Sequence, residues 1–287
     1  MEHALTVDVE DAINQAMRNF FGQEMEPTHR VHDNTMRLLD MFAEFDTKAT
    51  FFILGEVAHT HPGLIREIAS QGHELGIHGY SHKRYTQLSR EELREEIARA
   101  KKLVEDASGQ EVLGHRAPEF SINQNNLWAL EVLHAEGIQY DSSIFPAESG
   151  RYGWKGFTKE IDWFELENGE RIIEAPMSTV RFLGKEIPAC GGGYLRAFPY
   201  SFTNHAFKAI SQQRPVNLYL HPYEIDTPPY QQFYMDEVSH SSFKSKMKLR
   251  GYWFNRSTVI PKLRKLLSSY RFNTMSSVIQ TQLNTEQ

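Results

Sequence analysis

Two histidines lie four residues apart in the segment HGYSH, at residues 78 to 82. Imidazole is a common metal ligand, and this spacing lets both rings face one side of a helical turn. Two imidazoles and one carboxylate form the ligand set of a catalytic divalent site with positions left open for water and substrate. A chance pair is the alternative, because the chain contains 13 histidines in 287 residues. A metal site at His78 and His82 therefore requires a carboxylate and catalytic groups from other segments.

The segment TVDVED, at residues 6 to 11, places three carboxylates after a β-branched run. Asp8 and Glu10 are two residues apart and project from the same face of a strand, so one can bind metal while the other transfers a proton. In the HExxH motif the intervening glutamate is the general base, but HGYSH has no glutamate and needs a base from elsewhere. An ordinary acidic turn of Asp8, Glu10 and Asp11 is the alternative interpretation.

Strand-like segments alternate with helical patterns along most of the chain. The predicted strands are residues 4–9, 49–55, 73–79, 112–118, 138–143, 171–177 and 216–222. Three predicted helices are residues 35–45, 62–72 and 125–137. A fourth helix is expected to begin after Ser89, which forms a capping box with Glu92. Such alternation predicts a parallel α/β sheet, and seven strands indicate a deformed (β/α)7-type barrel. An open doubly wound sheet is the alternative, although no glycine-rich phosphate loop follows the first strand.

A parallel barrel collects its reactive groups at the C-terminal ends of its strands. The ionisable residues at these ends are Asp8, Glu10, Asp11, His78, His82, Arg116, Asp141 and His221. Taken alone, Arg116 could be a structural ion-pair partner and His221 a core histidine. Several strands that end in the same kind of group favour a shared site over a series of coincidences.

Composition restricts the classes of protein that the chain can belong to. The net charge of −6 and the pI near 6.1 argue against a nucleic-acid partner or an anionic membrane surface. No apolar run approaches the roughly 18 residues of a membrane span, and no secretory signal pattern is present. The single cysteine, Cys190, fits a reducing compartment, so we expect a cytoplasmic protein. The basic residues after residue 223 are interpreted as a solvated face.

We expect one domain, with the barrel in residues 1–225 and a C-terminal extension in residues 226–287 packed on it. The segments that would form the site also carry a family resemblance. The five motifs, in chain order, are TVDVED (6–11), HGYSH (78–82), RAPEF (116–120), YDSS (140–143) and LYLHP (218–222).

Over about residues 4–225 the chain resembles the polysaccharide deacetylases, the NodB-homology or carbohydrate esterase family four enzymes. The segments GHRAPEFSI, YDSSIFP, GGGYLR and HPYEID are most similar to the subgroup associated with bacterial exopolysaccharide biosynthesis. Val9 departs from the commoner family pattern, in which two aspartates are adjacent. The resemblance therefore implies Glu10 as the third metal ligand beside His78 and His82, with Asp11 as the second candidate.

The resemblance implies a metal-dependent hydrolase that removes N-acetyl groups from an amino-sugar polysaccharide or its precursor. The deacetylation would be a step of exopolysaccharide or cell-envelope glycan biosynthesis. The protein would lie peripheral to a membrane system that assembles the glycan. By the same resemblance Asp8 is the catalytic base, Arg116 orients Asp8, and His221 is the catalytic acid. The cofactor is one divalent ion, expected to be zinc, with cobalt or nickel as alternatives.

Phe120, Tyr194 and Tyr223 are candidates for stacking on the N-acetylated glycan, although each could equally be a core aromatic residue. A backbone N–H near Phe120 is expected to help bind the oxyanion, and Asp141 is expected to contact the substrate or to hold His221 or a neighbour in place. Two other classes remain open: a small-molecule amidase with or without metal, for example on a cyclic ureide, and a glycan-binding relative without catalysis.

Overall fold

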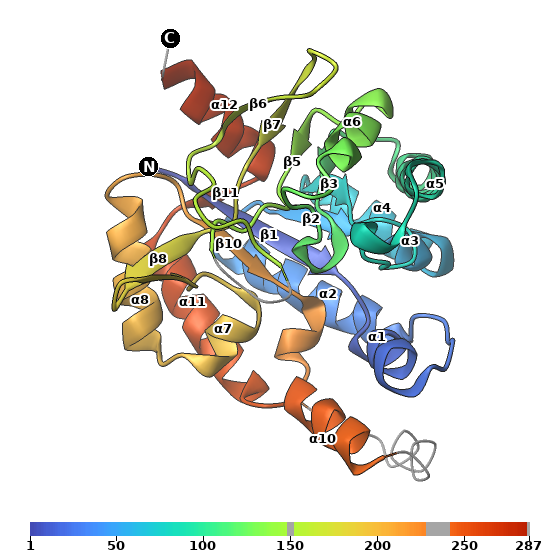
Figure 1. Ribbon diagram of the computed structural model, residues 1–287. Helices are drawn as coiled ribbons and strands as arrows, with labels where there is room; N and C mark the ends of the chain where they lie inside the picture. The colour runs from blue at the N-terminus through green and yellow to red at the C-terminus, as the bar shows by residue number, and fades with distance from the viewer. Residues whose placement is uncertain (148–151, 228–241, 286–287) are drawn as a thin grey trace.

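A nine-stranded, mostly parallel sheet forms the centre of the protein in the computed structural model, which describes residues 1–147, 152–227 and 242–285 (Figure 1). The strand order is β10–β1–β2–β3–β4–β5–β7–β6, and β11 (Phe272–Asn273) pairs with β1. Seven strands in this order run parallel: β1 (His3–Val9), β2 (Thr50–Ile53), β3 (Glu74–Ile77), β4 (Gly114–His115), β5 (Tyr140–Asp141), β7 (Arg171–Glu174) and β10 (Asn217–Leu220). These are the seven strands that the sequence predicted.

The strands follow one another around the sheet in chain order, and β10 returns to pair with the free side of β1. This order is typical of a barrel, whereas a doubly wound sheet reverses direction at an inner strand. β7 and β10 are the two ends of the parallel run, and side chains bridge the space between them. The Asn217 N–H donates to Ser178 Oγ at 2.8 Å, and Asn217 Nδ2 donates to Ser142 Oγ at 3.0 Å. The predicted fold class is confirmed as an α/β half-barrel.

β1 shows how the sheet separates the core from the site. Leu5, Val7 and Val9 are fully buried in the main apolar cluster, which the strands share with the helices around them. Thr6 and Asp8 project to the opposite face, where both accept hydrogen bonds from the same guanidinium group. The inner face of the half-barrel is therefore polar beside Thr6 and Asp8, whereas its other end is filled by an apolar cluster that includes Ala4, Phe52 and Tyr140.

Helices surround this sheet (Figure 1). In the first part of the chain they are α1 (Ala12–Ala16), η1 (Met17–Phe21), α2 (His29–Glu44), α3 (Gly55–Thr60), α4 (Pro62–Ser70), η2 (Tyr85–Gln87), α5 (Arg90–Ser108), η3 (Pro118–Phe120) and α6 (Trp128–Ala135). In the later part they are α7 (Gly192–Ala197), α8 (Tyr200–Ser211), η4 (Pro222–Ile225), α10 (Phe243–Tyr252), η5 (Arg256–Thr258), α11 (Val259–Ser269) and α12 (Met275–Thr285). The four predicted helices correspond to α2, α4, α5 and α6.

The start of α5 follows the predicted capping box. Ser89 Oγ accepts a hydrogen bond from the Glu92 N–H at 3.2 Å, and Glu92 Oε2 accepts one from the Ser89 N–H at 2.8 Å. The buried face of α5 consists of Leu93, Ile97, Ala100 and Val104, the residues that the 3.6-residue period selects.

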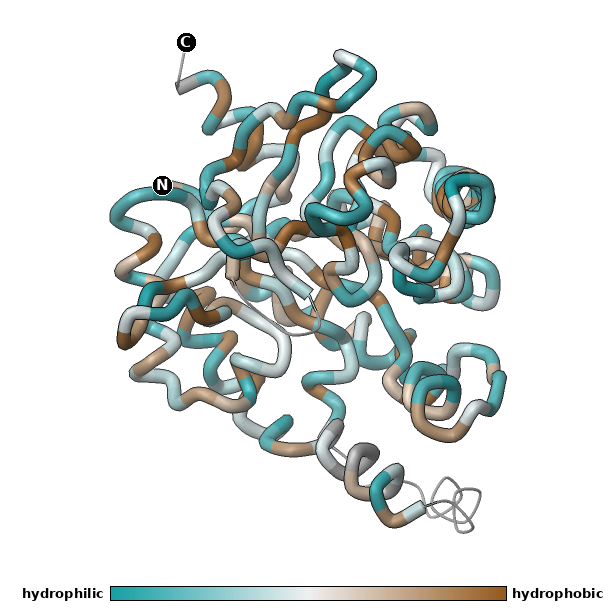
Figure 2. The backbone as a smooth tube through the Cα atoms, viewed as in Figure 1, coloured by the Kyte–Doolittle hydropathy of each residue, from teal (hydrophilic) through white to brown (hydrophobic). Residues whose placement is uncertain are grey.

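Several elements were not predicted from the sequence. They include α7, α8, α10, α11 and α12 as well as four short strands: β6 (Asp162–Glu165), β8 (Thr179–Phe182), β9 (Lys185–Pro188) and β11. β6 pairs antiparallel with β7, and β8 pairs with β9 in a separate hairpin. These strands are short and partly exposed, so they lack the buried apolar runs by which strands were found. Figure 2 shows hydrophobic stretches where strands and helices meet, and a hydrophilic tip on the β6–β7 hairpin.

The C-terminal residues join the same sheet, because β11 pairs with β1 at His3–Phe272 and Ala4–Asn273. The predicted division at residue 225 stays a prediction, and residues 228–241 of the predicted extension lie outside the described residues. Within the described parts of the chain, none of the helices has the length and apolar character needed to cross a bilayer.

Candidate functional site

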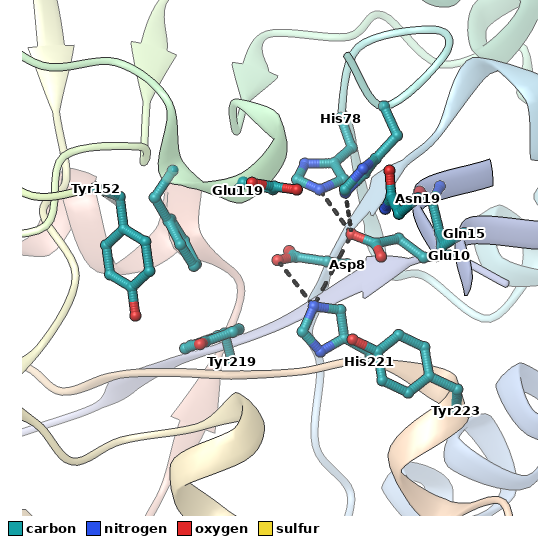
Figure 3. A pocket seen from close by; sticks show the side chains of 12 residues that line it. Asp8, Glu10, Gln15, Asn19, His78, Glu119, Tyr152, Tyr219, His221 and Tyr223 are labelled. Carbon is teal, nitrogen blue, oxygen red and sulfur yellow. Dashed lines mark hydrogen bonds and ion pairs between the residues drawn. The ribbon is translucent and has the colours of Figure 1, made fainter. Parts of the chain in front are cut away.

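Side chains that follow β1, β3, β4 and β10 line a cavity of about 180 Å³ (Figure 3). The lining residues are Asp8, Glu10, Gln15, Asn19, His78, His82, Glu119, Phe120, Tyr152, Tyr219, His221 and Tyr223. Seven of these twelve are site residues that the sequence predicted. The C-terminal ends of the strands therefore do bring the predicted groups into one place.

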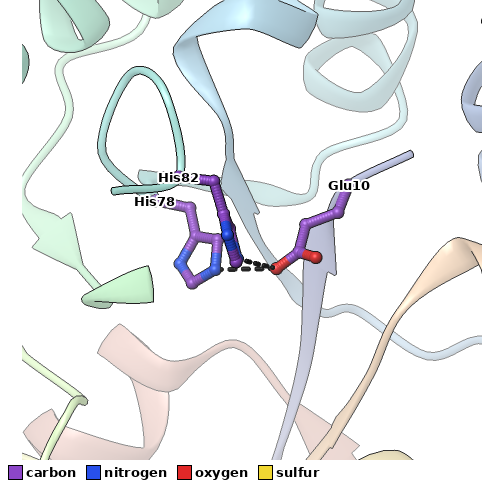
Figure 4. Close-up of side chains that lie close together, drawn as sticks. All are labelled: Glu10, His78 and His82. Carbon is purple, nitrogen blue, oxygen red and sulfur yellow. Dashed lines mark hydrogen bonds and ion pairs between the residues drawn. The ribbon is translucent and has the colours of Figure 1, made fainter. Parts of the chain in front are cut away.

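Glu10, His78 and His82 converge at one wall of this cavity (Figure 4). Glu10 Oε1 lies 2.9 Å from His78 Nε2 and 3.0 Å from His82 Nε2. The candidate ligand atoms of the three residues all lie within 4.8 Å of one another. Two imidazole nitrogens and one carboxylate oxygen are a suitable donor set for zinc and similar divalent ions.

The hydrogen bond at the far side of His78 tests whether a cation fits. His78 Nδ1 lies 2.8 Å from the carbonyl oxygen of Arg116, and a carbonyl can only accept, so Nδ1 carries the proton. In the neutral imidazole, Nε2 then has a lone pair that points at Glu10 Oε1, which is also an acceptor. A cation between these atoms resolves that conflict, and a backbone carbonyl behind a histidine is the usual outer support of a metal ligand. The residues therefore fit a divalent ion.

The two histidines reach this point from a loop, so the predicted helical turn is wrong. Residues 78–82 lie beyond the end of β3, with φ of 70° at Gly79 and 58° at His82. A Cβ atom at residue 79 would lie 3.2 Å from Tyr85 Oη and 3.3 Å from Pro118 Cγ. Positive φ is rare for residues other than glycine, so His82 needs support from its surroundings.

Glu96 of α5 supplies hydrogen bonds to this loop. Its Oε2 accepts from the backbone N–H groups of Tyr80 at 3.0 Å and Ser81 at 2.8 Å, and its Oε1 accepts from Ser81 Oγ at 2.6 Å. Glu96 therefore binds the chain directly between the two histidines. The sequence did not single out Glu96, because it lies among similar glutamates on the polar face of a helix.

Glu10 and Asp11 have different roles. Asp11 is the N-cap of α1, where its Oδ1 accepts from the N–H groups of Ile13 at 2.7 Å and Asn14 at 3.0 Å. Its Oδ2 accepts from the N–H of Thr28 at 2.8 Å and from the Thr28 hydroxyl at 2.5 Å. Both oxygens of Asp11 are therefore engaged in holding the backbone, while Glu10 faces the histidines.

Asp8 lies beside this cluster in a buried ion pair with Arg116. Arg116 Nη1 donates to Asp8 Oδ1 at 2.7 Å and to Thr6 Oγ1 at 2.8 Å. Arg116 Nε donates to the Ser142 carbonyl at 3.0 Å, and Nη2 donates to Ser142 Oγ at 3.0 Å. The guanidinium group, which is fully buried, therefore has fixed partners and holds one oxygen of Asp8 in place.

His221 faces the two carboxylates from across the cavity (Figure 3). Its Nε2 lies 3.9 Å from Asp8 Oδ2 and 3.9 Å from Glu10 Oε1. Its ring stacks on Tyr223, with centroids 4.6 Å apart and planes 16° apart. On the other side, Nδ1 lies 3.7 Å from Oε2 of the fully buried Glu224. These distances are longer than hydrogen bonds, so neither carboxylate is bonded directly to the His221 ring.

The mutual attraction of these groups shifts their pKa values. Burial alone would lower the pKa of His221, but Glu10, Glu224 and Asp8 outweigh it and raise that pKa above the ordinary value. Burial likewise opposes protonation of His82, and Glu10 outweighs it, so the pKa of His82 is raised. Burial would raise the pKa of Glu10, but the charges of His82 and His221 and the close contacts of its carboxylate with the rings of His78 and His82 hold that pKa well below its usual range.

Two predicted substrate-binding residues lie outside the lining of this cavity. Asp141 is fully buried and accepts from His115 Nδ1 at 2.6 Å and from Ser143 Oγ at 2.6 Å, so it holds His115 and not His221. Tyr194 is half-buried, and its hydroxyl lies 2.8 Å from the hydroxyl of Tyr152, which does line the cavity. Tyr194 therefore supports a wall residue of the cavity.

Phe120 lines the cavity, with φ of 52°, but its backbone N–H is not free for an oxyanion. That N–H donates to the Ala117 carbonyl at 3.0 Å. The N–H of Phe120 itself is therefore used inside the η3 turn, and the expectation of an oxyanion donor near Phe120 stays a prediction.

Sequence reasoning missed five lining residues: Gln15, Asn19, Glu119, Tyr152 and Tyr219. Tyr219 and Glu119 lie inside the quoted motifs LYLHP and RAPEF, so the motifs contained a signal that was not used. Gln15 lies in α1 and Asn19 in η1, and they are four residues apart, which is the spacing of one helix face. Tyr152 follows a segment of irregular sequence that gives no pattern.

Family models match two consecutive parts of the chain. Residues 22–138 match a model described as polysaccharide deacetylase, and residues 142–280 match one described as a domain of unknown function (DUF3473). The chain is 35% identical over 98 residues to a peptidoglycan-N-acetylglucosamine deacetylase of Bacillus cereus, which is 34% of this chain and 36% of that protein. It is 29% identical over 137 residues to a peptidoglycan deacetylase of Helicobacter pylori, which is 47% of this chain and 42% of that protein. The matches thus span less than half the length of these curated relatives.

Two solved structures share the fold along almost the entire chain. A Mycobacterium smegmatis protein assigned to the polysaccharide deacetylases aligns with a TM-score of 0.62 and 18% identity, over 99% of this chain and 92% of that one. The PuuE allantoinase aligns with a TM-score of 0.62 and 14% identity, over 96% of this chain and 88% of that one. At these identities the likeness concerns the fold alone.

Proposed function

Because residues 22–138 of this chain match the polysaccharide deacetylase family, we propose that the protein hydrolyses the N-acetyl groups of an amino-sugar glycan with a divalent metal ion at Glu10, His78 and His82. The observation that carries the proposal is the convergence of this ligand set with the Asp8–Arg116 pair and His221 in one cavity. A set that contains a base, an acid and a metal-binding group meets the requirements of amide hydrolysis.

A divalent ion at this position would polarise the acetamide carbonyl and bring the pKa of a bound water from 15.7 to about 7, and zinc is the ion that the donor set favours. Asp8 accepts the proton of the attacking water at Oδ2, since Oδ1 is held by Arg116. Arg116 fixes the orientation of Asp8 through this charge-assisted hydrogen bond, so Oδ2 is the oxygen left to face the water.

His221 donates a proton from Nε2 to the leaving nitrogen of the sugar. An amine is too basic to leave as an anion, so this donor is needed for the C–N bond to break. The nearby carboxylates raise the pKa of His221, which favours the protonated ring, and the stacked Tyr223 and buried Glu224 flank that ring.

We propose further that the glycan belongs to an exopolysaccharide or a cell envelope, and that Phe120 and Tyr223 contact its sugar rings. The position of both aromatic rings in the cavity lining supports this proposal. The motifs GHRAPEFSI and HPYEID support the exopolysaccharide class.

The test is acetate release from N-acetylated chito-oligosaccharides, peptidoglycan fragments and a partly acetylated exopolysaccharide. Activity should disappear with a chelator and in Asp8→Asn, and should return when zinc, cobalt or nickel is added to the chelated enzyme. Allantoin is included as a cyclic ureide substrate. Turnover of allantoin without acetate release would instead identify a small-molecule amidase, and glycan binding without any turnover would identify a non-catalytic relative.

A further inference from the structure

Two arginines, Arg116 and Arg256, are the largest fully buried side chains in the described residues. Arg116 holds Asp8 in the cavity, whereas none of the proposed steps uses Arg256, which begins η5 near the C-terminus. Its burial also departs from the predicted solvated face of the basic residues after residue 223. A charged group is costly to bury unless its surroundings compensate it, so the contacts of Arg256 need an explanation.

The contacts of Arg256 lead to the turn that follows His221. Its Cζ lies over the ring of Trp253, 3.9 Å from the ring centre, and over the ring of Tyr223, 5.2 Å from the ring centre. A cation over the face of an aromatic ring is attracted by the ring electrons. Arg256 Nη1 also donates to the carbonyl oxygen of Asp226 at 3.4 Å, directly after η4. The guanidinium group therefore contacts both the ring of Tyr223 and the backbone at the end of η4.

Tyr223 in turn contacts the ring of His221 (Figure 3). The two rings are stacked, with centroids 4.6 Å apart and planes 16° apart, and Tyr219 meets His221 edge-on with centroids 5.7 Å apart. Both nitrogens of the His221 ring lie 3.7 to 3.9 Å from the nearest carboxylate oxygens, which is too long for hydrogen bonds. Packing against the tyrosine rings therefore sets the plane of the imidazole, and no hydrogen bond to these carboxylates does so.

Trp253 connects the other side of Arg256 to the first part of the chain. It packs against a buried cluster on α1 and η1 that consists of Ile13, Ala16 and Met17. α1 begins two residues after Glu10, the proposed metal ligand. The contacts therefore run from His221 through Tyr223, Arg256 and Trp253 to the segment that follows the ligand side of the cavity.

We propose that Arg256 is a positioning residue for the catalytic acid, because its guanidinium group holds the Tyr223 ring on which His221 stacks. The role of His221 as the acid rests on the proposed function, whereas the positioning of its ring does not. Lysine does not replace arginine here, since its ammonium group has the same charge but no planar face to lie over two aromatic rings. The C-terminal residues are then part of the catalytic unit and not only an extension packed on the barrel.

The first experiment observes the His221 ring without turnover, by NMR of protein labelled with ¹³C at histidine. The stacked Tyr223 shifts the ring signals of His221 through its ring current, and the spectrum of His221→Ala identifies these signals by their absence. Arg256→Lys should move them toward the positions of an unstacked histidine. Trp253→Leu keeps the charge but removes one of the two rings that Arg256 covers, so it should move the signals in the same direction by less.

The matched control is Arg214→Lys. Arg214 is also buried, and its Nη2 donates to one backbone carbonyl, that of Thr179, at 3.1 Å. It precedes β10, whereas His221 follows the other end of that strand. The control should leave the His221 signals unchanged, and circular dichroism checks that each variant folds. If Arg256→Lys does not fold, Trp253→Leu decides, and unchanged His221 signals in the folded variants of both positions would overturn the proposal.

The second experiment compares acetate release from an N-acetylated chito-oligosaccharide with hydrolysis of an activated acetate ester. In Arg256→Lys the kcat on the amide should fall by roughly 10- to 100-fold, because a misplacement of about 1 Å can cost about 100-fold. KM should stay the same, since Arg256 is not among the residues that line the cavity. The ester, whose leaving group needs little protonation, should be affected much less, and metal content should not change.

Equal falls of the amide and ester rates in Arg256→Lys would show a merely structural role for Arg256 and would also overturn the proposal. An unmodified protein that hydrolyses no N-acetyl group would contradict the proposed function alone. In that case the His221 signals still decide whether Arg256 positions the ring.

Discussion

The two sides of the cavity are held in different ways. On the ligand side, Glu10 touches His78 and His82 at 2.9 and 3.0 Å, and the Arg116 carbonyl and Glu96 support the histidines from behind. On the acid side, both nitrogens of the His221 ring lie 3.7 to 3.9 Å from the nearest carboxylate oxygens. The ligand side is therefore closely packed and supported from behind, whereas the His221 ring nitrogens lie beyond hydrogen-bond distance of the carboxylates.

The two sides also come from different parts of the chain. The histidines and Glu96 lie within residues 22–138, and His221 and Glu224 lie within residues 142–280, which match separate family models. Arg196 of α7 approaches Glu224 at 3.2 Å, so the later part of the chain supports the acid as α5 supports the ligands. One site is thus assembled from two structural supports that can be disrupted separately.

The largest effect is expected from His78→Ala, which breaks the ligand side. The variant should lose bound metal and fall to background acetate release, because one of three ligands is missing. A catalytic metal on a packed barrel is not needed for folding, so circular dichroism should be unchanged. Metal analysis by mass spectrometry checks this, with His59→Ala, an exposed histidine, as the control. Loss of secondary structure in His78→Ala would show a core histidine instead of a ligand.

Alanine variants of Glu10 and Asp11 test which carboxylate is the third metal ligand. Glu10→Ala should lose metal, since its carboxylate faces both histidines. Asp11→Ala should keep metal and lose roughly 0.5–2 kcal/mol of unfolding free energy, because an N-cap is removed. Metal content and urea unfolding of both variants decide the matter. The reverse pattern would assign the third ligand to Asp11.

The acid side should respond without loss of metal. His221→Ala should lower acetate release by roughly 10²–10⁴, the usual contribution of one positioned acid, while metal content stays at the level of the unmodified protein. The rate on an activated acetate ester should be affected much less, since that leaving group needs little protonation. An ester rate that falls as far as the amide rate would show that His221 is structural.

The sequence predicted the strands of the half-barrel well, because each is a buried run whose neighbours are also buried. Leu5, Val7 and Val9 give β1 its pattern, and the same kind of pattern marks β2 and β10. It also predicted which residues meet at the strand ends, because parallel strands place their C-terminal ends together. The short strands β6, β8 and β9 were missed, since partly exposed residues give no buried run.

What the sequence could not predict depends on contacts between distant segments. The loop that carries His82 was expected to be helical, but Glu96 stabilises it with a positive φ. Asp141 was expected near the substrate because it follows a strand, yet its partner is His115 of the neighbouring strand. In both cases the deciding partner is a residue whose own sequence context is ordinary.

A smaller effect is expected where the ligand side is supported from behind. Glu96→Ala removes the acceptor for two backbone N–H groups and one hydroxyl in the loop between the histidines. Metal affinity should fall about 10–100-fold, the range for partners that hold metal ligands in place. Competition with a chelator measures the affinity, and Glu95→Ala, an exposed neighbour on the same helix, is the control. Equal affinities in both variants would show that the loop holds His82 without Glu96.

The smallest effect concerns histidines outside the site, which behave in the opposite way to His82 and His221. Burial lowers the pKa of His3 and of His73 to about 4. The groups that shift these two pKa values include no carboxylate, so nothing acidic opposes the effect of burial. The unfolded chain, in which the pKa is about 6.5, binds more protons than the folded one between these values, so stability is complete above pH 6.5 and falls as the pH drops toward 4. For each of these two histidines, lowering the pH from 7.5 to 5 should reduce the free energy of unfolding by about 1–2 kcal/mol.

The variant His73→Gln tests this, because glutamine cannot titrate and can still accept a hydrogen bond from the Ala49 N–H. Urea unfolding at both pH values should show a smaller loss of stability in this variant than in the unmodified protein. An identical loss in His73→Gln and the unmodified protein would mean that His73 does not contribute, and that acid sensitivity comes from other groups.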